Sequence, residues 1–428
     1  MAGPSLSSIH GVHQSNLPLE VMERVLSLLP LPVLCRMRTV CKEWNHIICS
    51  SSFHDSYEQT WEERGHGACF LTKFHSNPYT KIDRSVRGTT CFLDLDERRW
   101  YLIKGSVDQG FDTRDVAMGD GLVAEICCPI VDDEGYNIRA PTVCCIQMSD
   151  PILKMRWRLD PCPNESKLPS LVVVAAHRGS RVFRIFAFDN SGYPFPGFHR
   201  CLWIYESSTN KWRCARKGSD NNYARAARSA VVFQQGLYAI FRRSRPMGPL
   251  LALYDVEKDT WSMVLENLPA SGCVQLVVSS SKLFMMILRS ARSSSSSSAM
   301  MLEMVEIQVS EKTSRIVFQI PASTLSHIFG EVLSQCYTFA KYITCLALRL
   351  NSDSSCSSVV LFSKSSGKVI IYNVVSATAD ILPEHPLGET KPGYHQYWAT
   401  HQNLYVRDIL QKDAQSNPPV YVPKEQLI

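Results

Sequence analysis

The chain has 428 residues, 45% of them hydrophobic and 20% charged, and its formal net charge is +5. This is ordinary globular composition, and the length suits two or three average domains, or one small domain and one large β domain. The charge is too small to indicate nucleic-acid binding by itself, so nucleic acid is not expected as a partner.

Neither the N-terminus nor the hydropathy pattern indicates membrane targeting. Residues 1–6 lack the basic and apolar regions of a secretory signal, and Ala2 stands where N-myristoylation requires Gly. No apolar run reaches the about 18 residues that a membrane span needs. We therefore expect a soluble intracellular protein without a membrane partner, in the nucleus, the cytoplasm or both.

The 16 cysteines are predicted to be reduced. A chain of this length can build a core without disulfide bridges. The doublets Cys127-Cys128 and Cys144-Cys145 stand in apolar runs, where thiols behave as small hydrophobic side chains. Neither a CxxC pair nor an HExxH sequence occurs, so no metal site and no cofactor is predicted.

The N-terminal region is predicted to be helical after a short tail. Residues 1–14 are small and polar, which indicates a disordered tail. Over residues 15–55 apolar residues recur at helical spacing. Pro18 suits the first turn of a helix, and Pro30 ends that helix near Leu29. Three short helices are predicted.

The remainder of the chain has a β pattern. After a linker at 56–65, residues 66–390 show short β-rich runs with period two between Gly, Pro, Ser and Asp turns. Residues 391–428 are polar and contain proline, and we expect a poorly ordered tail. A serine run at 293–298 is interpreted as a solvated loop.

A strand–turn–tryptophan unit repeats within residues 66–390, at intervals of about 50 residues, which is the length of a kelch blade. We predict a propeller of six blades, in which each Trp fills the space between neighbouring blades. The copies are LDLDERRW (93–100), MRW (155–157, degraded), LWIYESSTNKW (202–212), LYDVEKDTW (253–261), and, without Trp, EIQVSEKT (306–313) and IYNVVSAT (371–378).

Two N-terminal segments carry a family resemblance. NLPLEVMERVLSLLP (16–30) and CRMRTVCKEWNHII (35–48) resemble the opening and the close of an F-box. With the kelch-like repeats downstream, the chain resembles the plant-type F-box/kelch-repeat family. The expected fold is a small all-α F-box of three helices followed by an all-β kelch-type propeller of six blades.

The resemblance implies a function. F-boxes bind the Skp adaptor, which bridges to a cullin and a RING subunit, so the protein would be the substrate-recognition subunit of this ubiquitin ligase. The propeller would bind an unknown protein substrate, and the protein would have no catalytic residues of its own. The residues that would form or support the adaptor-binding surface are, by position, Leu17, Pro18, Val21, Leu31, Pro32, Leu34, Val40, Cys41 and Trp44.

Other functions stay open at this point. The propeller could be an interaction scaffold that acts outside the ligase complex. Some kelch propellers are copper oxidases with Tyr, His and Cys ligands, but such ligands are not identifiable here. No nucleophile elbow, P-loop or dinucleotide fingerprint occurs. The acidic run Asp132-Asp133-Glu134 precedes Gly135 and is better explained as a hairpin turn than as a metal site.

Basic residues greatly outnumber acids between positions 211 and 245. Because Arg pairs bidentately with carboxylate and phosphate, we hypothesise that some of them contact an acidic or phosphorylated substrate. Solvated loop charges on different faces are the alternative. The candidate substrate-binding residues are Arg225, Arg228, Arg242 and Arg243.

Overall fold

The computed structural model divides the chain into two compact units. The first comprises Met1–Arg64 and Val406–Pro418, and the second comprises Gly65–Tyr405 and Pro419–Ile428. No helix among the described residues is long and apolar enough to cross a membrane. The described residues are 17–29, 31–50, 52–53, 56–57, 60, 69–75, 90–94, 98–103, 111–119, 122–129, 145–150, 155–160, 162–163, 169–176, 182–189, 202–215, 227–241, 248–268, 274–279, 282–291, 299–329, 343–350, 356–363, 368–383, 395–401 and 420–421.

The first unit contains the three short helices that the sequence predicts: α1 (Leu19–Ser27), α2 (Leu31–Met37) and α3 (Lys42–Ile48). Further helical residues stand at 52–53, 56–57 and 60. The last three of these fall in the segment predicted as a linker, so the helical module continues past residue 56. The cause is packing, because Tyr57 is buried and its hydroxyl donates to the Leu29 carbonyl at 3.2 Å.

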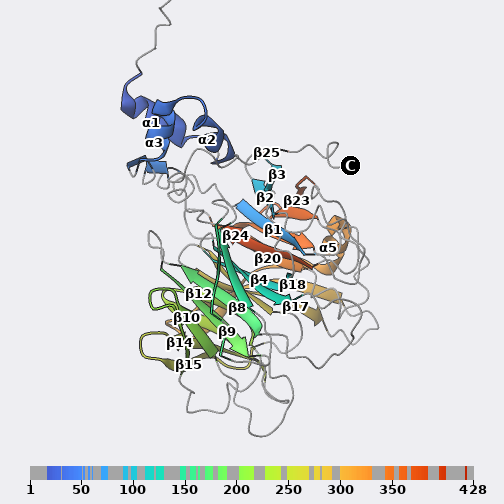
Figure 1. Ribbon diagram of the computed structural model, residues 1–428. Helices are drawn as coiled ribbons and strands as arrows, with labels where there is room; N and C mark the ends of the chain where they lie inside the picture. The colour runs from blue at the N-terminus through green and yellow to red at the C-terminus, as the bar shows by residue number, and fades with distance from the viewer. Residues whose placement is uncertain are drawn as a thin grey trace, which may run out of the picture. The chain divides into compact units, whose positions relative to one another are not determined.

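The second unit contains six antiparallel sheets among the described residues (Figure 1). Strands follow one another in chain order within five of the sheets, as in a meander. The first sheet has the order β24 (His395–His401), β1 (Cys69–His75), β2 (Thr90–Asp94), β3 (Arg99–Ile103) and β25 (Val420–Tyr421). The second has β4 (Phe111–Gly119), β5 (Leu122–Pro129), β6 (Cys145–Asp150) and β7 (Met155–Arg158), and the third has β8 (Pro169–Ala176), β9 (Phe183–Asp189), β10 (Leu202–Glu206) and β11 (Lys211–Cys214).

The other three sheets have the same four-stranded meander. The fourth sheet has β12 (Ala227–Phe233), β13 (Gly236–Phe241), β14 (Leu250–Asp255) and β15 (Thr260–Leu265). The fifth has β16 (Val274–Ser279), β17 (Lys282–Ala291), β18 (Ala299–Gln308) and β19 (Thr313–Pro321), and the sixth has β20 (Ile343–Leu350), β21 (Cys356–Ser363), β22 (Val369–Asn373) and β23 (Thr378–Ile381).

The leading strands of the six sheets are neighbours in space. β4 contacts β8, β8 contacts β12, β12 contacts β16, and β16 contacts β20. β20 also contacts β24, which contacts β4, so the series returns to its start. This closed order of antiparallel sheets is consistent with a β-propeller.

The predicted C-terminal tail at 391–428 needs correction, because it contributes two strands to the first sheet. All seven residues of β24 are in register with β1, from Cys69 opposite His401 to His75 opposite His395. β25 pairs with β3 on the other edge of the same sheet. The polar composition suggested a tail. These residues nevertheless form a strand, because strand pairing uses backbone N–H and C=O groups, which a hydropathy pattern does not report.

Each sequence repeat falls on the hairpin between the third and fourth strands of a sheet. Trp100, Trp212 and Trp261 stand opposite Leu93, Tyr205 and Tyr254 in these hairpins. In the two repeats without Trp, Ser314 stands opposite Ile307 and Ala379 opposite Tyr372. The tight turn needs one residue with positive φ, which occupies the same place in five hairpins: Arg98, Asn210, Asp259, Lys312 and Ala377, with φ of 52°, 55°, 54°, 53° and 54°.

The tryptophan ring nitrogens link neighbouring sheets. Trp212 Nε1 donates to the Asp160 carbonyl at 2.8 Å, and Trp100 Nε1 donates to the Pro383 carbonyl at 2.9 Å. Both acceptors stand two residues beyond the last strand of the preceding sheet, β7 and β23 respectively. Two of the tryptophans that were predicted to fill the space between blades therefore also form a directional hydrogen bond to the preceding sheet.

We expect Trp212→Phe to destabilise the second unit by about 1 kcal/mol, because the ring stays apolar but the hydrogen bond to Asp160 is lost. Trp212→Ala should cost about 3–5 kcal/mol, since the ring contacts are lost as well. Chemical denaturation of the full chain measures both values. Equal stability of the Phe variant and the wild type would contradict the role of the hydrogen bond.

Apolar residues fill the seams between consecutive sheets. One cluster of buried residues joins the third and fourth sheets around Phe186, Phe241 and Tyr254, and another joins the fourth and fifth around Ile240 and Met285. The seam between the fifth and sixth sheets contains a helix that the sequence did not predict, α5 (Ala322–Phe329). Its residues Leu325 and Phe329 are fully or almost fully buried there.

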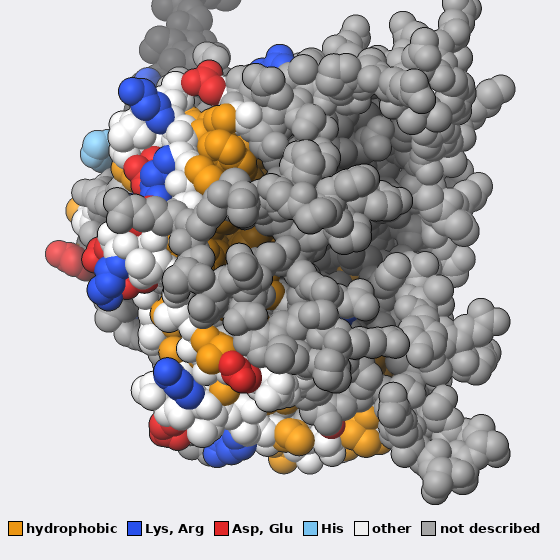
Figure 2. Space-filling view, turned by 90° about the horizontal axis from the view of Figure 1, so that it is seen from below, with side chains coloured by type: hydrophobic (Ala, Val, Ile, Leu, Met, Phe, Trp, Pro, Cys, Tyr) orange, Lys and Arg blue, Asp and Glu red, His pale blue; other side chains and the backbone are white. Residues whose placement is uncertain are grey.

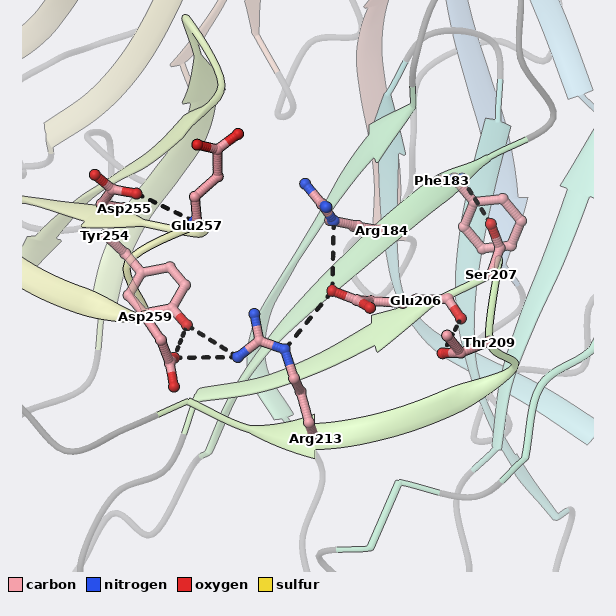
Figure 3. A network of polar contacts seen from close by, with 10 residues as sticks. All are labelled: Phe183, Arg184, Glu206, Ser207, Thr209, Arg213, Tyr254, Asp255, Glu257 and Asp259. Atoms are coloured by element: carbon pink, nitrogen blue, oxygen red, sulfur yellow. Dashed lines mark hydrogen bonds and ion pairs between the residues drawn. The ribbon is translucent and has the colours of Figure 1, made fainter.

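A polar network spans the seam between the third and fourth sheets (Figure 3). Arg213 of β11 lies between Glu206 of its own sheet, at 3.6 Å, and Asp259 of the next sheet, at 3.1 Å. It also donates to the Tyr254 hydroxyl at 3.2 Å, and that hydroxyl donates to Asp259. Burial and the bond to Asp259 raise the pKa of Tyr254 to about 12.

The raised pKa of Tyr254 predicts a pH dependence of stability. The unfolded chain releases this proton near pH 10, whereas the folded chain holds it to about pH 12. The hydroxyl's contribution is therefore complete below pH 10 and is lost as pH rises from 10 to 12. We expect the stability advantage of the wild type over Tyr254→Phe to shrink over this range, measured by denaturation at each pH. A constant difference would contradict the prediction.

Candidate functional site

Apolar side chains that remain exposed identify the first unit as the candidate site. α1 packs one side inward, with Leu26 1% exposed. On another side of the helix, Val21, Val25 and Leu28 are spaced i, i+4 and i+7, so they form one stripe, called here the α1 stripe. Among the described residues of this unit, the exposed large apolar ones are Leu17 (53%), Leu19 (54%), Val21 (43%), Val25 (52%), Leu28 (36%) and Val40 (59%).

The local sequence fixes where α1 begins. The carbonyl of Pro18 accepts hydrogen bonds from the N–H groups of Val21 and Met22, at 3.0 and 3.1 Å. Glu20 in the first turn and Arg24 in the last turn both complement the helix dipole. Pro18 itself is exposed, as is Leu17 before it. Because the first turn of α1 is held by these hydrogen bonds, Leu17 and the α1 stripe keep a fixed position relative to each other.

A small core supports these exposed residues. Leu34 is fully buried, and Ile47, Ile48 and Phe53 are nearly or fully so. Leu34 was predicted among the residues that form or support the adaptor-binding surface, and in the structure its side chain lies in this core. Arg38 is also buried, and its Nε donates to Asn45 Oδ1 at 3.0 Å, which ties the α2–α3 corner to α3.

Cys41 and Trp44 stand at the start of α3. The Cys41 sulfur caps the helix by accepting the Trp44 backbone N–H at 3.4 Å. Cys41 is exposed and Trp44 is half-buried, and Val40 is 59% exposed. Leu31 and Pro32 begin α2, but their side chains lie outside what the structure describes.

Sequence reasoning missed three of the exposed apolar residues: Leu19, Val25 and Leu28. Val25 and Leu28 are among the apolar residues at helical spacing on which the helix prediction depends. That prediction gave no way to tell a side that packs on α2 and α3 from a side left open, because both have the same spacing. Only the burial of Leu26 in the structure separates the two sides of α1.

The candidate arginines of the second unit are only partly described. Arg228 stands on β12 and is exposed, whereas Arg225, Arg242 and Arg243 lie outside the described residues, as does the run at 132–134. Over the described part of the face in Figure 2, basic and acidic side chains are interspersed with apolar ones. Among the described residues, no group of three or more His, Cys, Asp or Glu side chains is placed to hold a metal ion.

The exposed apolar face and the helices beneath it coincide with a known domain. Residues 14–56 match the F-box domain family. The first unit contains an F-box domain. The sequence predicted an F-box at 15–55, and the family match confirms that an F-box is present. An F-box implies binding to the Skp adaptor.

Comparison with other known proteins adds little to the F-box assignment. No curated protein matches the chain in sequence. Among solved structures, it is similar to a chain of the nidogen/laminin complex at 11% identity and a TM-score of 0.45, over 79% of this chain and 100% of that one. It is also similar to TolB from Acinetobacter baumannii at 11% identity and a TM-score of 0.43, over 81% and 72% of the two chains. Likenesses this distant carry no argument about function.

The core of the F-box should depend on Leu34. Leu34→Ala leaves a cavity and should cost about 2–5 kcal/mol, enough to unfold a module of this size. Val25→Ala is the matched control: its side chain is half exposed, so stability should change by less than about 0.5 kcal/mol. Hydrogen exchange of the α1–α3 amides in the full chain measures both. Protection that is unchanged in Leu34→Ala would contradict the prediction.

Proposed function

We propose that this protein is the substrate-recognition subunit of a Skp–cullin–F-box ubiquitin ligase. The F-box domain at 14–56 is the observation that carries the proposal. F-box proteins are typically subunits of this ligase without catalytic activity of their own. The protein would hold a substrate so that its lysines come close to the ubiquitin-charged enzyme, which is catalysis by proximity.

The adaptor surface would comprise Leu17, the α1 stripe and Val40, with Cys41 and Trp44 at the start of α3. A helical module of this size buries a small fraction of its apolar surface by itself, so a partner that covers the exposed side chains also stabilises it. Leu34 would support this surface from the core of the domain, because its side chain is fully buried. The six sheets of the second unit would be the six blades of a kelch-type propeller that binds a protein substrate.

The structural support for the propeller as a receptor is its repeated architecture. In a closed series of six sheets, the strands keep the same arrangement from sheet to sheet. The turns and connections are the parts that can vary in sequence. A role as an interaction scaffold outside the ligase uses the same frame. The two functions differ only in whether the F-box binds the adaptor with useful affinity.

Adaptor binding by purified full-length protein tests the proposal. Val25→Asp and Leu17→Asp place a charge among exposed apolar side chains, so binding should fall by at least about a hundredfold while the fold survives. His46→Asp is the control, because His46 is an exposed polar residue of α3 and not part of the apolar set. Calorimetry or surface plasmon resonance gives the affinities, and thermal melting checks the fold.

Absence of adaptor binding by well-folded wild-type protein would exclude the ligase function and leave the scaffold. Equal loss in His46→Asp and Val25→Asp would show that the apolar face is not the contact surface.

A further inference from the structure

Two ion pairs join neighbouring sheets of the second unit. Arg98 stands in the β2–β3 turn of the first sheet and pairs with Asp380 of β23, in the sixth sheet, through Nη1 and Oδ1 at 3.3 Å and through Nη2 and Oδ2. Asp259 stands in the β14–β15 turn of the fourth sheet and pairs with Arg213 of β11, in the third sheet, at 3.1 Å (Figure 3). In both cases a turn residue contacts the sheet that precedes its own in the closed series.

The two ion pairs occupy equivalent positions. Arg98 and Asp259 both have positive φ, and each stands directly before the last strand of its hairpin, β3 or β15. We call this place in a sheet the turn position. Asp380 and Arg213 are each the third residue of the corresponding strand, β23 or β11, and we call this place the outer position. The charges are reversed, because the cation is at the turn position in one pair and at the outer position in the other.

The other seams lack opposite charges at these positions. The outer position is held by the uncharged Tyr101, Trp157 and Ser262 in the first, second and fourth sheets. Arg315 holds it in the fifth sheet, but the turn position of the sixth sheet is Ala377. Residue types therefore allow this ion pair at two of the six seams between the described sheets: between the third and fourth, and between the sixth and first.

Those two seams divide the six sheets into two sets of three. We call the first to third sheets the first half and the fourth to sixth sheets the second half. Both cations, Arg98 and Arg213, belong to the first half, and both anions, Asp259 and Asp380, belong to the second half. Contact between the two halves therefore brings opposite charges together at both seams.

Contact between like halves would have the opposite effect. If a first half met another first half, Arg98 would stand against Arg213, and two second halves would set Asp259 against Asp380. Like charges at the distance of an ion pair repel. Apolar burial discriminates less between these arrangements, because it is non-directional and all seams of a repeated architecture offer apolar surface. Wrong pairing of repeated elements is a known way for such proteins to misassemble.

We propose that the two ion pairs direct the first half of the second unit to close on the second half and oppose contact between like halves, within one chain or between two copies. This device depends on the sheets alone and is independent of the ligase function. It acts mainly through the repulsion that a wrong contact would create, because an exposed ion pair by itself contributes little to stability. The side chains of Arg98 and Asp380 are 54% and 45% exposed, whereas those of Arg213 and Asp259 are 34% and 23% exposed and are screened less by salt.

Exchange variants of the full chain test the device at constant composition. The turn exchange is Arg98→Asp with Asp259→Arg, and the strand exchange is Asp380→Arg with Arg213→Asp. Either exchange alone sets like charges against each other at both seams, whereas the two together restore opposite charges. After refolding from urea, size-exclusion chromatography with light scattering gives the yield of monomer. We expect either exchange to lower this yield at least about threefold in favour of oligomers, and the variant with all four substitutions to recover most of it.

A smaller set of variants avoids a complication at the seam between the third and fourth sheets, where Arg213 also contacts Glu206 and Tyr254. Arg98→Asp, Asp380→Arg and the variant with both substitutions form a double-mutant cycle at the exposed pair. We expect a coupling of about threefold in the unfolding equilibrium constant of the second unit. About 1 M salt should remove most of this coupling, because it screens charges beyond about 3 Å.

Lys312→Glu with Glu311→Lys is the matched control. It reverses an exposed charge at the turn position of the fifth sheet and keeps the composition. The outer position that precedes it is the uncharged Ser262, so the monomer yield should stay at the wild-type value.

Three results would overturn the proposal: exchange variants that refold to monomer as the wild type does, a variant with all four substitutions that recovers nothing, or a control that loses as much monomer as the turn exchange. A loss that persists unchanged at high salt would also overturn it, since packing and not charge would then be the cause.

Discussion

Pairing between β24 and β1 joins the last long strand of the second unit to its first. Each four-stranded sheet presents apolar residues on both faces, and a neighbouring sheet must cover each face. Without β24 the first sheet would lose its leading strand, and the contacts with β4 and β20 would go with it. The series of sheets would then have two open ends. A backbone ladder between distant parts of the chain is therefore the condition for burying the apolar residues of all the sheets.

Two kinds of interaction stabilise the seams between sheets, and they contribute in different ways. Apolar clusters such as the one around Phe186 and Tyr254 supply most of the free energy, because burial of apolar surface is non-directional and grows with area. Polar contacts across the seams fix the relative position of the sheets. Gln275 of β16 exchanges two hydrogen bonds with the backbone of Cys345 in β20, each 3.0 Å long. Such contacts select one arrangement among many that would bury similar area.

The two units meet the same need for apolar burial in opposite ways. The sheets cover one another within the chain, and the largest fully buried side chains include Tyr254, Phe284 and Phe362. The F-box has too few residues to do so, and Val25 and Val40 remain more than half exposed. A partner that binds this face would remove these side chains from water. The module that is least able to bury its own apolar surface is thus the one best suited to docking.

Patterns that are local in the chain were predictable: three helices from apolar spacing and prolines, the F-box motif, and the one hairpin in each of the six sheets that carries a repeat copy. Each depends on residues within about a dozen positions of one another. The assignment of β24 and β25 to the first sheet, the α5 helix in the seam between the fifth and sixth sheets and the exposed side of α1 were not predictable. These depend on which distant segment pairs or packs with which. The sequence by itself determined the three N-terminal helices and the repeated hairpins. Only the tertiary structure decided which apolar and charged residues stay at the surface, because burial is a property of neighbours that the chain brings together from afar.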